Sequence, residues 1–116
     1  MFEIKKISDS VTLQELKSMA DRQFGSLVKA VVDIEKNTMA VGGEMHADEE
    51  TFLINDGSRQ ENLWGINIYP EQQGESRIEF DSMINIRPYL GNRSRGVENP
   101  ELQKKIISIV TQLVKE

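Results

Sequence analysis

The sequence predicts an α+β fold of two layers, with a mostly antiparallel sheet of about five strands and three helices in the order β-α-β-β-α-β-β-α. Three observations indicate it: several segments alternate apolar and polar residues with a period of two, two helix starts carry capping signals, and short turns join successive strands into hairpins. We expect the helices on one face of the sheet. The 116 residues fit a single domain, residues 1–116, because single cores usually occupy about 100–150 residues.

Alternating segments mark the strands. The longest runs from Arg77 to Arg87, with one apolar side on which Ser82 is the polar exception. Ser82 is expected to bond a neighbouring backbone group, to mark a bulge, or to lie beside a cavity. Shorter alternations predict strands over Phe2–Ile7, Leu27–Glu35, Thr38–Val41 and Leu63–Tyr69.

Capping residues define the first and last helices. Thr12 and Glu15 form a capping box, and apolar residues then recur at helical spacing until Gly25, which suits a left-handed C-terminal position. At the other end of the chain, Asn99 is a predicted N-cap and Pro100 fits the first helical position.

The middle helix is predicted over residues 47–56. Its acidic residues at 48–50 would lie at the positive end of the helix, and Gly57 would stop it. A strand over Thr51–Asn55 is the competing interpretation, because Phe52, Leu53 and Ile54 also suit a buried strand.

Composition excludes several classes of protein. The net charge of −5 argues against a broadly basic nucleic-acid surface, although it leaves room for a local anion site. No apolar stretch reaches the roughly 18–20 residues of a membrane helix, so no membrane partner is expected. The absence of cysteine removes thiol chemistry, and together with the absence of a secretory h-region it favours a cytoplasmic location.

Three motifs resemble a known family when taken together. They are residues 42–48 (GGEMHAD), residues 57–67 (GSRQENLWGIN) and residues 81–88 (DSMINIRP) with the following GNRS at 91–94. The chain resembles a small prokaryotic family classed only as a domain of unknown function. The resemblance spans nearly the whole chain and implies a compact single-domain protein, but it carries no activity and no site residue.

An anion site is the leading functional prediction, because positive charge is concentrated at Arg87–Arg95 within an acidic chain. Guanidinium groups match phosphate or carboxylate oxygens, and the last helix offers backbone N–H groups nearby. The competing interpretation pairs these arginines with the chain's own carboxylates at 48–50. The predicted ligand-binding residues are Asn85, Arg87, Asn92, Arg93, Ser94 and Arg95, in a non-catalytic binding module for a small anion.

A divalent metal site is the first alternative. If residues 44–50 were extended, Glu44, His46 and Asp48 would share one side and supply a mixed nitrogen and oxygen ligand set. A metal-dependent hydrolase would then combine these residues with the arginines. If 47–56 is a helix instead, His46 becomes a turn residue that bonds neighbouring backbone.

Topology decides whether the two motifs meet. If the strand that starts at Leu63 runs parallel to Thr38–Val41, the arginine loop leaves the sheet at the end opposite His46; if it runs antiparallel, both lie at one end. A homodimerising or protein-interaction domain is the second alternative. Its predicted surface is the helix-free sheet face with Lys29, Val31, Asp33, Asn67, Met83 and Asn85.

Overall fold

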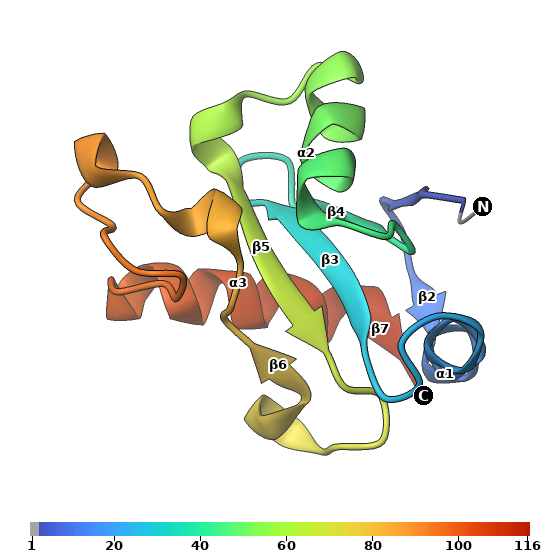
Figure 1. Cartoon of the computed structure of the whole chain (residues 1–116). Coiled ribbons are helices and arrows are strands. Elements are labelled where there is room, and N and C mark those ends of the chain that lie inside the picture. Colours follow the sequence, from blue (N-terminus) through green and yellow to red (C-terminus); the bar gives the residue numbers. More distant parts are fainter. Residues whose placement is uncertain (1–2) are drawn as a thin grey trace.

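A five-stranded sheet forms the centre of the fold in a computed structural model that describes residues 3–116 (Figure 1). Its strand order is β1-β4-β3-β5-β6, and every neighbouring pair is antiparallel. The helices and strands are β1 (Lys5–Ile7), β2 (Val11–Thr12), α1 (Leu13–Arg22), β3 (Val28–Asp33), β4 (Thr38–Val41), α2 (His46–Asn55), β5 (Leu63–Ile68), β6 (Ile78–Glu79), α3 (Pro100–Leu113) and β7 (Val114–Lys115). Short 3₁₀ turns cover Gln60–Asn62, Gly74–Arg77, Met83–Asn85 and Pro88–Leu90.

The predicted fold class is confirmed: the chain is α+β, with three helices and a mostly antiparallel sheet of five strands. A second, parallel pairing of β2 with β7 was not predicted. Each of these strands has two residues, which is too short to show a period in the sequence.

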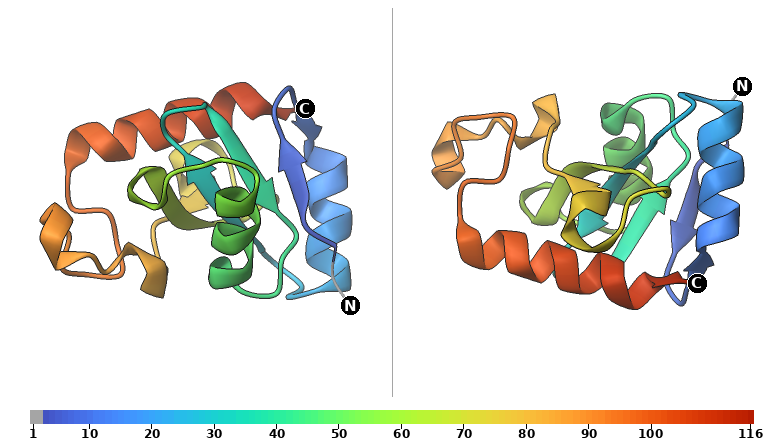
Figure 2. Two further views of the ribbon diagram at one scale, coloured as in Figure 1. Left: turned by 90° about the horizontal axis from the view of Figure 1, so that it is seen from above. Right: turned by 90° about the horizontal axis from the view of Figure 1, so that it is seen from below.

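The helices cover both faces of the sheet, which differs from the expected two layers with all helices on one face. Figure 2 shows α3 along one side of the sheet and α2 on the opposite side. The division follows from strand alternation: Ala30 and Val32 of β3 pack with α1 and α3, whereas Val31 between them packs with Leu53 of α2. Because α2 buries Val31, the face predicted for homodimerisation is partly covered.

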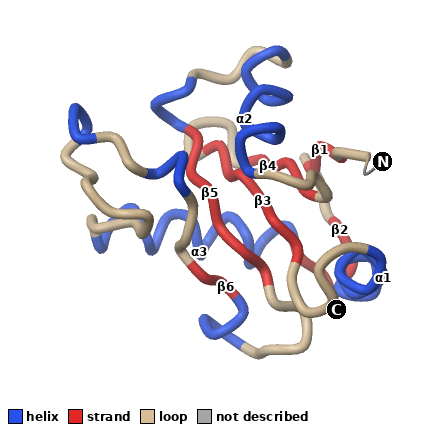
Figure 3. Tube along the Cα trace, viewed as in Figure 1, coloured by secondary structure: helices blue, strands red, loops and turns tan. Residues whose placement is uncertain are grey.

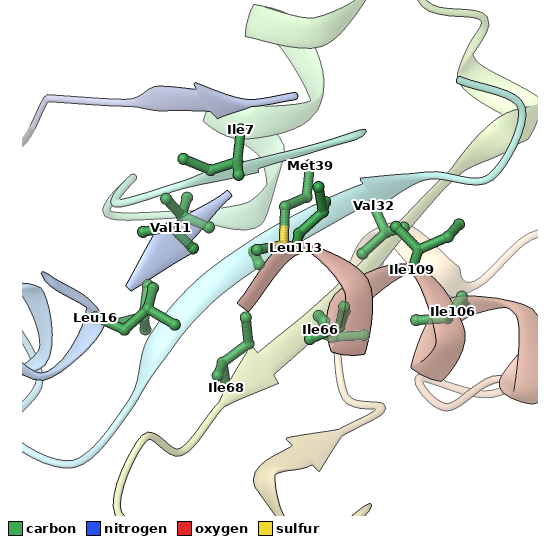
Figure 4. Close-up of a cluster of buried hydrophobic side chains, with 14 of the residues drawn as sticks. Ile7, Val11, Leu16, Val32, Met39, Ile66, Ile68, Ile106, Ile109 and Leu113 are labelled. Carbon is green, nitrogen blue, oxygen red and sulfur yellow. The ribbon is translucent and has the colours of Figure 1, made fainter. Parts of the chain in front are cut away.

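The main core lies between the sheet and the pair α1 and α3 (Figure 4). It accounts for most of the fully buried apolar side chains, and α3 contributes Ile106, Ile109, Val110 and Leu113 to it. Burial of one such side chain stabilises the fold by about 1.5–3 kcal/mol. The labelled members are Ile7, Val11, Leu16, Val32, Met39, Ile66, Ile68, Ile106, Ile109 and Leu113.

The long strand predicted over Arg77–Arg87 is wrong. Regular pairing with β5 is limited to Ile78 and Glu79, and a 3₁₀ turn at Met83–Asn85 follows within a long segment drawn mostly as loop (Figure 3). The alternation is present in the sequence, but the side chain of Asn85 takes the place of a backbone ladder at Gly65. The buried side therefore changes along the segment: Ile78 and Phe80 pack against the main core, whereas Asn85 and Arg87 are buried farther on and Ile86 is exposed.

The predicted helix ends are confirmed. Thr12 and Glu15 form both bonds of the capping box, and Asn99 accepts a hydrogen bond from the backbone N–H of Glu101 at 2.9 Å. Gly25 and Gly57 have φ of +89° and +103°, the left-handed conformation that favours glycine. The helix interpretation of residues 47–56 holds over the strand interpretation. Phe2, where the first strand was predicted to start, lies outside the described residues.

Glu49 is a buried carboxyl group on the sheet side of α2. It has no exposed surface, and its Oε2 accepts a hydrogen bond from the N–H of Gly43 at 2.9 Å while Oε1 has no partner. Burial raises the pKa of Glu49 well above its ordinary value, against smaller lowering effects of the Gly43 N–H and of Lys29. The fold therefore favours the neutral acid at this position.

We predict that Glu49→Gln stabilises the protein increasingly as pH rises. The folded-state pKa lies above the unfolded one, so the neutral acid's contribution is complete below the unfolded pKa of about 4.5 and is lost as pH rises to the folded pKa. The variant's advantage in urea unfolding should grow by up to about 1.4 kcal/mol per pH unit in that window. Glu44→Gln, at an exposed position, is the control. If the difference in unfolding free energy between Glu49→Gln and the unchanged protein did not vary with pH, the assignment of Glu49 as a buried neutral acid would be wrong.

Candidate functional site

A small pocket of about 190 Å³ lies on the α2 face of the sheet, beyond the part that α2 covers. It is bounded by β3, β5, the first turn of α2, and residues 81–84 and 95 of the segment between β6 and α3. Three of its lining side chains, His46, Asn67 and Ser82, are at least nine-tenths buried. The lining residues are Lys29, Met45, His46, Ala47, Asn67, Asp81, Ser82, Met83, Ile84 and Arg95.

The floor of the pocket comes from a cross-strand pair. Lys29 of β3 lies directly opposite Asn67 of β5, and strand alternation directs both away from the main core. The Asn67 Nδ2 donates to Glu79 Oε1 at 2.9 Å, which leaves its Oδ1 buried without a partner. Lys29 Nζ lies 4.9 Å from the centre of the Phe24 ring and forms no ion pair within residues 3–116. The pocket therefore offers a positive charge beside an unused acceptor.

His46 is held at the start of α2 by the backbone of β5. Its Nε2 lies 2.8 Å from the carbonyl oxygen of Ile66, and because that oxygen only accepts, Nε2 carries the proton. Burial lowers the pKa of His46, with a smaller effect of Lys29 in the same direction; the Ile66 carbonyl, Asp81 and the Asn67 side chain act against it. The neutral ring therefore has a lone pair on Nδ1.

Gly65 allows His46 and Ser82 to lie against β5. A Cβ atom at residue 65 would come within 2.6 Å of Ser82 Oγ and 3.2 Å of His46 Cδ2. Ser82 lines the pocket, and its Oγ accepts from the backbone N–H of Ile84 at 3.3 Å. Two of the roles expected for Ser82, a bond to neighbouring backbone and a place beside a cavity, are thus both realised.

Arg95 forms the outer wall of the pocket. Its Nε donates to Asp81 Oδ1 at 2.7 Å, and its side chain is about half exposed. A guanidinium group has five N–H donors, so this single bond leaves its Nη groups able to contact a ligand. Of the predicted ligand-binding residues, Arg95 is the one that lines the pocket.

Arg87 is a buried structural residue. Its Nη2 bonds Glu50 Oε2 at 2.7 Å, its Nη1 bonds the carbonyl of Leu63 at 2.6 Å, and its guanidinium lies 5.2 Å from the Trp64 ring centre. It is 4 % exposed, which leaves no side for a ligand. The interpretation in which these arginines pair with the chain's own carboxylates therefore applies to Arg87, with Glu50 as its partner.

Asn85 and Asn92 also hold the backbone together. Asn85 exchanges two hydrogen bonds with the backbone of Gly65, at 2.8 and 2.9 Å, and donates a third to the carbonyl of Arg95. Asn92 Nδ2 donates to the carbonyls of Asn85, Ser94 and Gly96, and its Oδ1 accepts from the N–H of Glu98. Both amides are fully used within the chain.

Arg93 and Ser94 lie at the surface, away from the pocket lining. The backbone N–H of Arg93 donates to Glu98 Oε2 at 3.0 Å, and Ser94 Oγ accepts from the N–H of Gly96 at 3.3 Å. Hydrogen bonds from Ser94 and from the Arg93 backbone lower the pKa of the Glu98 carboxyl. Glu98 thus supplies the negative charge at this loop.

The predicted metal ligands do not converge. Glu44 and Asp48 are exposed, whereas His46 is buried against β5. Among residues 3–116, no group of three or more histidine, aspartate or glutamate side chains could hold a metal ion. Because α2 begins at His46, residues 44–48 do not share one extended side, which was the condition for the site.

Arg87 and Arg95 lie at different positions along β5. β4 and β5 are each antiparallel to β3, so they run in the same direction, the case in which the loop was expected opposite His46. Arg87, bonded to the first residue of β5, follows that expectation. The chain then returns, and the N–H of Ser82 bonds the carbonyl of Arg95 at 2.9 Å. Arg95 thereby reaches the pocket that holds His46.

The sequence prediction missed Lys29, Asn67, Asp81 and Ser82 as site residues. Alternation already placed Lys29 and Asn67 on the same sheet face, and a lone serine on an apolar side pointed to a cavity. The missing information was the pairing of β3 with β5 in this register and the cover that α2 provides.

Two larger hollows, of about 450 and 470 Å³, lie on either side of Arg77 and Glu116. Their charged groups are largely matched: Arg77 faces Glu116 at 3.9 Å, and Lys17 faces Glu71 at 3.4 Å. No buried polar atom without a partner lines either hollow in the described chain. The smaller pocket is therefore the better candidate site.

The chain matches a known protein family over most of its length. The family described as "Protein of unknown function (DUF5674)" matches residues 5–113. The chain belongs to this family. The match confirms the resemblance to a domain of unknown function, and the DUF5674 description states no activity. No curated protein and no solved structure matches the chain. No helix within residues 3–116 is long and apolar enough to cross a bilayer.

We predict that Asn92→Ala destabilises this DUF5674 protein by about 2–4 kcal/mol, because the change leaves buried backbone groups without partners. Arg93→Ala, its exposed neighbour, should change the free energy of unfolding by less than about 0.5 kcal/mol. Urea unfolding followed by circular dichroism measures both values. Equal small effects would show that Asn92 is free for another role.

Proposed function

We propose that this protein is a non-catalytic binding module for a small anionic ligand, which it binds in the pocket formed by Lys29, His46, Asn67, Ser82 and Arg95. The observation that carries the proposal is a pair of cationic groups in one pocket: Lys29, which forms no ion pair among residues 3–116, and Arg95, whose Nη groups are not used by its bond to Asp81. The buried Oδ1 of Asn67, which has no partner among the described residues, marks a place in the same pocket where a hydrogen-bond donor is missing. The proposal keeps the predicted ligand class and replaces most of the predicted residues.

The start of α2 supports the anion assignment. Its N-cap, Met45, has no side-chain acceptor, so the first N–H groups of the helix have no cap. His46 and Ala47, the first two helical residues, line the pocket. The acidic residues of this turn are not part of the lining: Asp48 is exposed, and Glu49 is bonded to Gly43. The helix dipole therefore adds positive potential to that of Lys29 and Arg95.

The hydrolase alternative has less support, because the described carboxylates form no metal ligand set with His46. A homodimer is supported on the predicted sheet face by the exposed Met83, whereas Val31 is covered. We also propose that the protein is located in the cytoplasm of a prokaryotic cell. This location is supported by the cysteine-free composition and by the family resemblance.

We predict that Lys29→Met and Arg95→Gln each weaken binding of butanoate by about tenfold, since each removes one charge next to the ligand. Arg93→Gln, a matched change in the same loop outside the pocket, should leave the affinity within about twofold. Amide proton–nitrogen NMR titration measures all three and should show saturable shifts at His46 and Ala47. If Arg93→Gln alone abolishes binding, the exposed loop is the site; if no shift saturates, the proposed function is wrong.

We predict that butanoate affinity increases as pH falls below the ordinary histidine value of about 6.5. The charged groups facing His46 are Lys29, Asp81 and Arg95. Burial lowers the pKa of free His46, and a bound anion would raise it, so protonation and binding favour each other. Butanoate remains ionised above about pH 6 because carboxyl pKa values lie near 4. His46→Gln should remove the pH dependence, and an equal slope in that variant would exclude His46 as its source.

A further inference from the structure

The pocket has cationic donors along one side. Lys29 has no acidic partner within residues 3–116, Arg95 uses only its Nε for Asp81, and the first N–H groups of α2 are uncapped. Such donors match the two oxygens of a carboxylate. They explain attraction of an anion but do not distinguish one small anion from another.

Two acceptors lie close together beside these donors. His46 Nδ1 has a lone pair, because Nε2 must donate to the carbonyl of Ile66. The Asn67 side chain neighbours the imidazole ring, and its Oδ1 is buried without a donor. Rotating the Asn67 amide would not help, because its Nδ2 is bonded to Glu79. A hydrogen-bond donor is therefore missing at this position.

A proton on His46 Nδ1 is one way to supply the missing donor. Burial opposes it, and so does the charge of Lys29, since both lower the pKa of His46. Lys29 and Arg95 also carry donors at this pocket, but in the complex they engage the carboxylate, so a donor group on the ligand is then the group placed to pair with this acceptor. A ligand that pairs with a buried acceptor should bind about tenfold to a hundredfold more tightly than one that leaves it unpaired.

Pocket size and lining limit the rest of the ligand. About 190 Å³ corresponds to the liquid volume of roughly six water molecules, below the range of about 300–1,000 Å³ of drug-sized sites. Met45 and Met83 are more than half exposed at the pocket, and Ile84 also lines it. These side chains suit a short apolar group.

We propose that the pocket recognises small carboxylic acids that carry a hydrogen-bond donor on the carbon next to the carboxylate, which are the 2-hydroxy and 2-amino acids with short aliphatic chains. The carboxylate contacts Lys29, Arg95 and the start of α2. A hydroxyl donates its one proton to Asn67 Oδ1, an ammonium can donate to both Asn67 Oδ1 and His46 Nδ1, and the aliphatic chain contacts the two methionines. This inference rests on the proposed anion-binding function and adds the class of ligand.

The test compares ligands that differ by one donor. NMR titrations of the full chain with butanoate, 2-hydroxybutanoate and 2-aminobutanoate at pH 7.5 measure the three affinities. We expect at least one of the two donor-bearing acids to bind about tenfold to a hundredfold more tightly than butanoate. If butanoate binds as tightly as both, the inference is overturned and the binding module stands. If none of the three binds, the proposed function fails as well.

Variants assign the selectivity to its atoms. Asn67→Ala should reduce the affinity advantage of the donor-bearing acid over butanoate to about twofold or less. Tyr69→Phe is the matched control: Tyr69 bonds the same Glu79 oxygen as Asn67 but does not line the pocket, so selectivity should persist. Unchanged selectivity in Asn67→Ala would overturn the assignment. A ligand-free His46 already protonated at pH 7.5, as seen in imidazole nitrogen spectra, would also overturn it.

Discussion

The pairing of the Asn85 amide with the backbone of Gly65 is the interaction on which this arrangement depends. Asn85 Oδ1 accepts from the Gly65 N–H and its Nδ2 donates to the Gly65 carbonyl, so this side chain does what the backbone of one partner residue does in an antiparallel ladder. The same Nδ2 bonds the carbonyl of Arg95, which draws the returning loop back to the sheet. Because Gly65 has no side chain, Ser82 and His46 can pack against the backbone of β5 next to these bonds. Without the bond from Asn85 to the Arg95 carbonyl, the loop that forms the outer wall of the pocket would not be held at the sheet.

In this acidic chain, a buried arginine and a more exposed one differ in how completely they are paired. The arginine that is closed off, Arg87, is matched by Glu50 and by a backbone carbonyl, which is the condition for keeping a buried charge. Arg95 stays near solvent with one carboxylate partner, and Lys29 has none among residues 3–116. Two cationic side chains of this acidic protein thus lie at one concave place, with Asp81 as the carboxylate in its lining.

The features that the sequence predicted correctly are local. Thr12 and Asn99 cap their helices through bonds to residues three and two positions away, and Gly25 and Gly57 end helices through their own φ angles. The error over Arg77–Arg87 has a physical reason as well. Alternation in the sequence predicts one buried apolar side along a strand, but after Ser82 the buried residues are the polar Asn85 and Arg87, which bond β5, while Ile86 is exposed.

Local sequence was enough to predict the fold class, the helix ends and the family resemblance, because each depends on residues near one another in the chain. It also predicted that Lys29 and Asn67 share one sheet face. Three features depend on long-range contacts: α2 covers the face opposite α3, the side chains of Asn85, Arg87 and Asn92 bond the chain itself, and Arg95 returns to the pocket that contains His46. These outcomes depend on partners 7 to 37 positions apart, and an amide or guanidinium looks the same in a sequence whether it binds a ligand or the chain's own backbone.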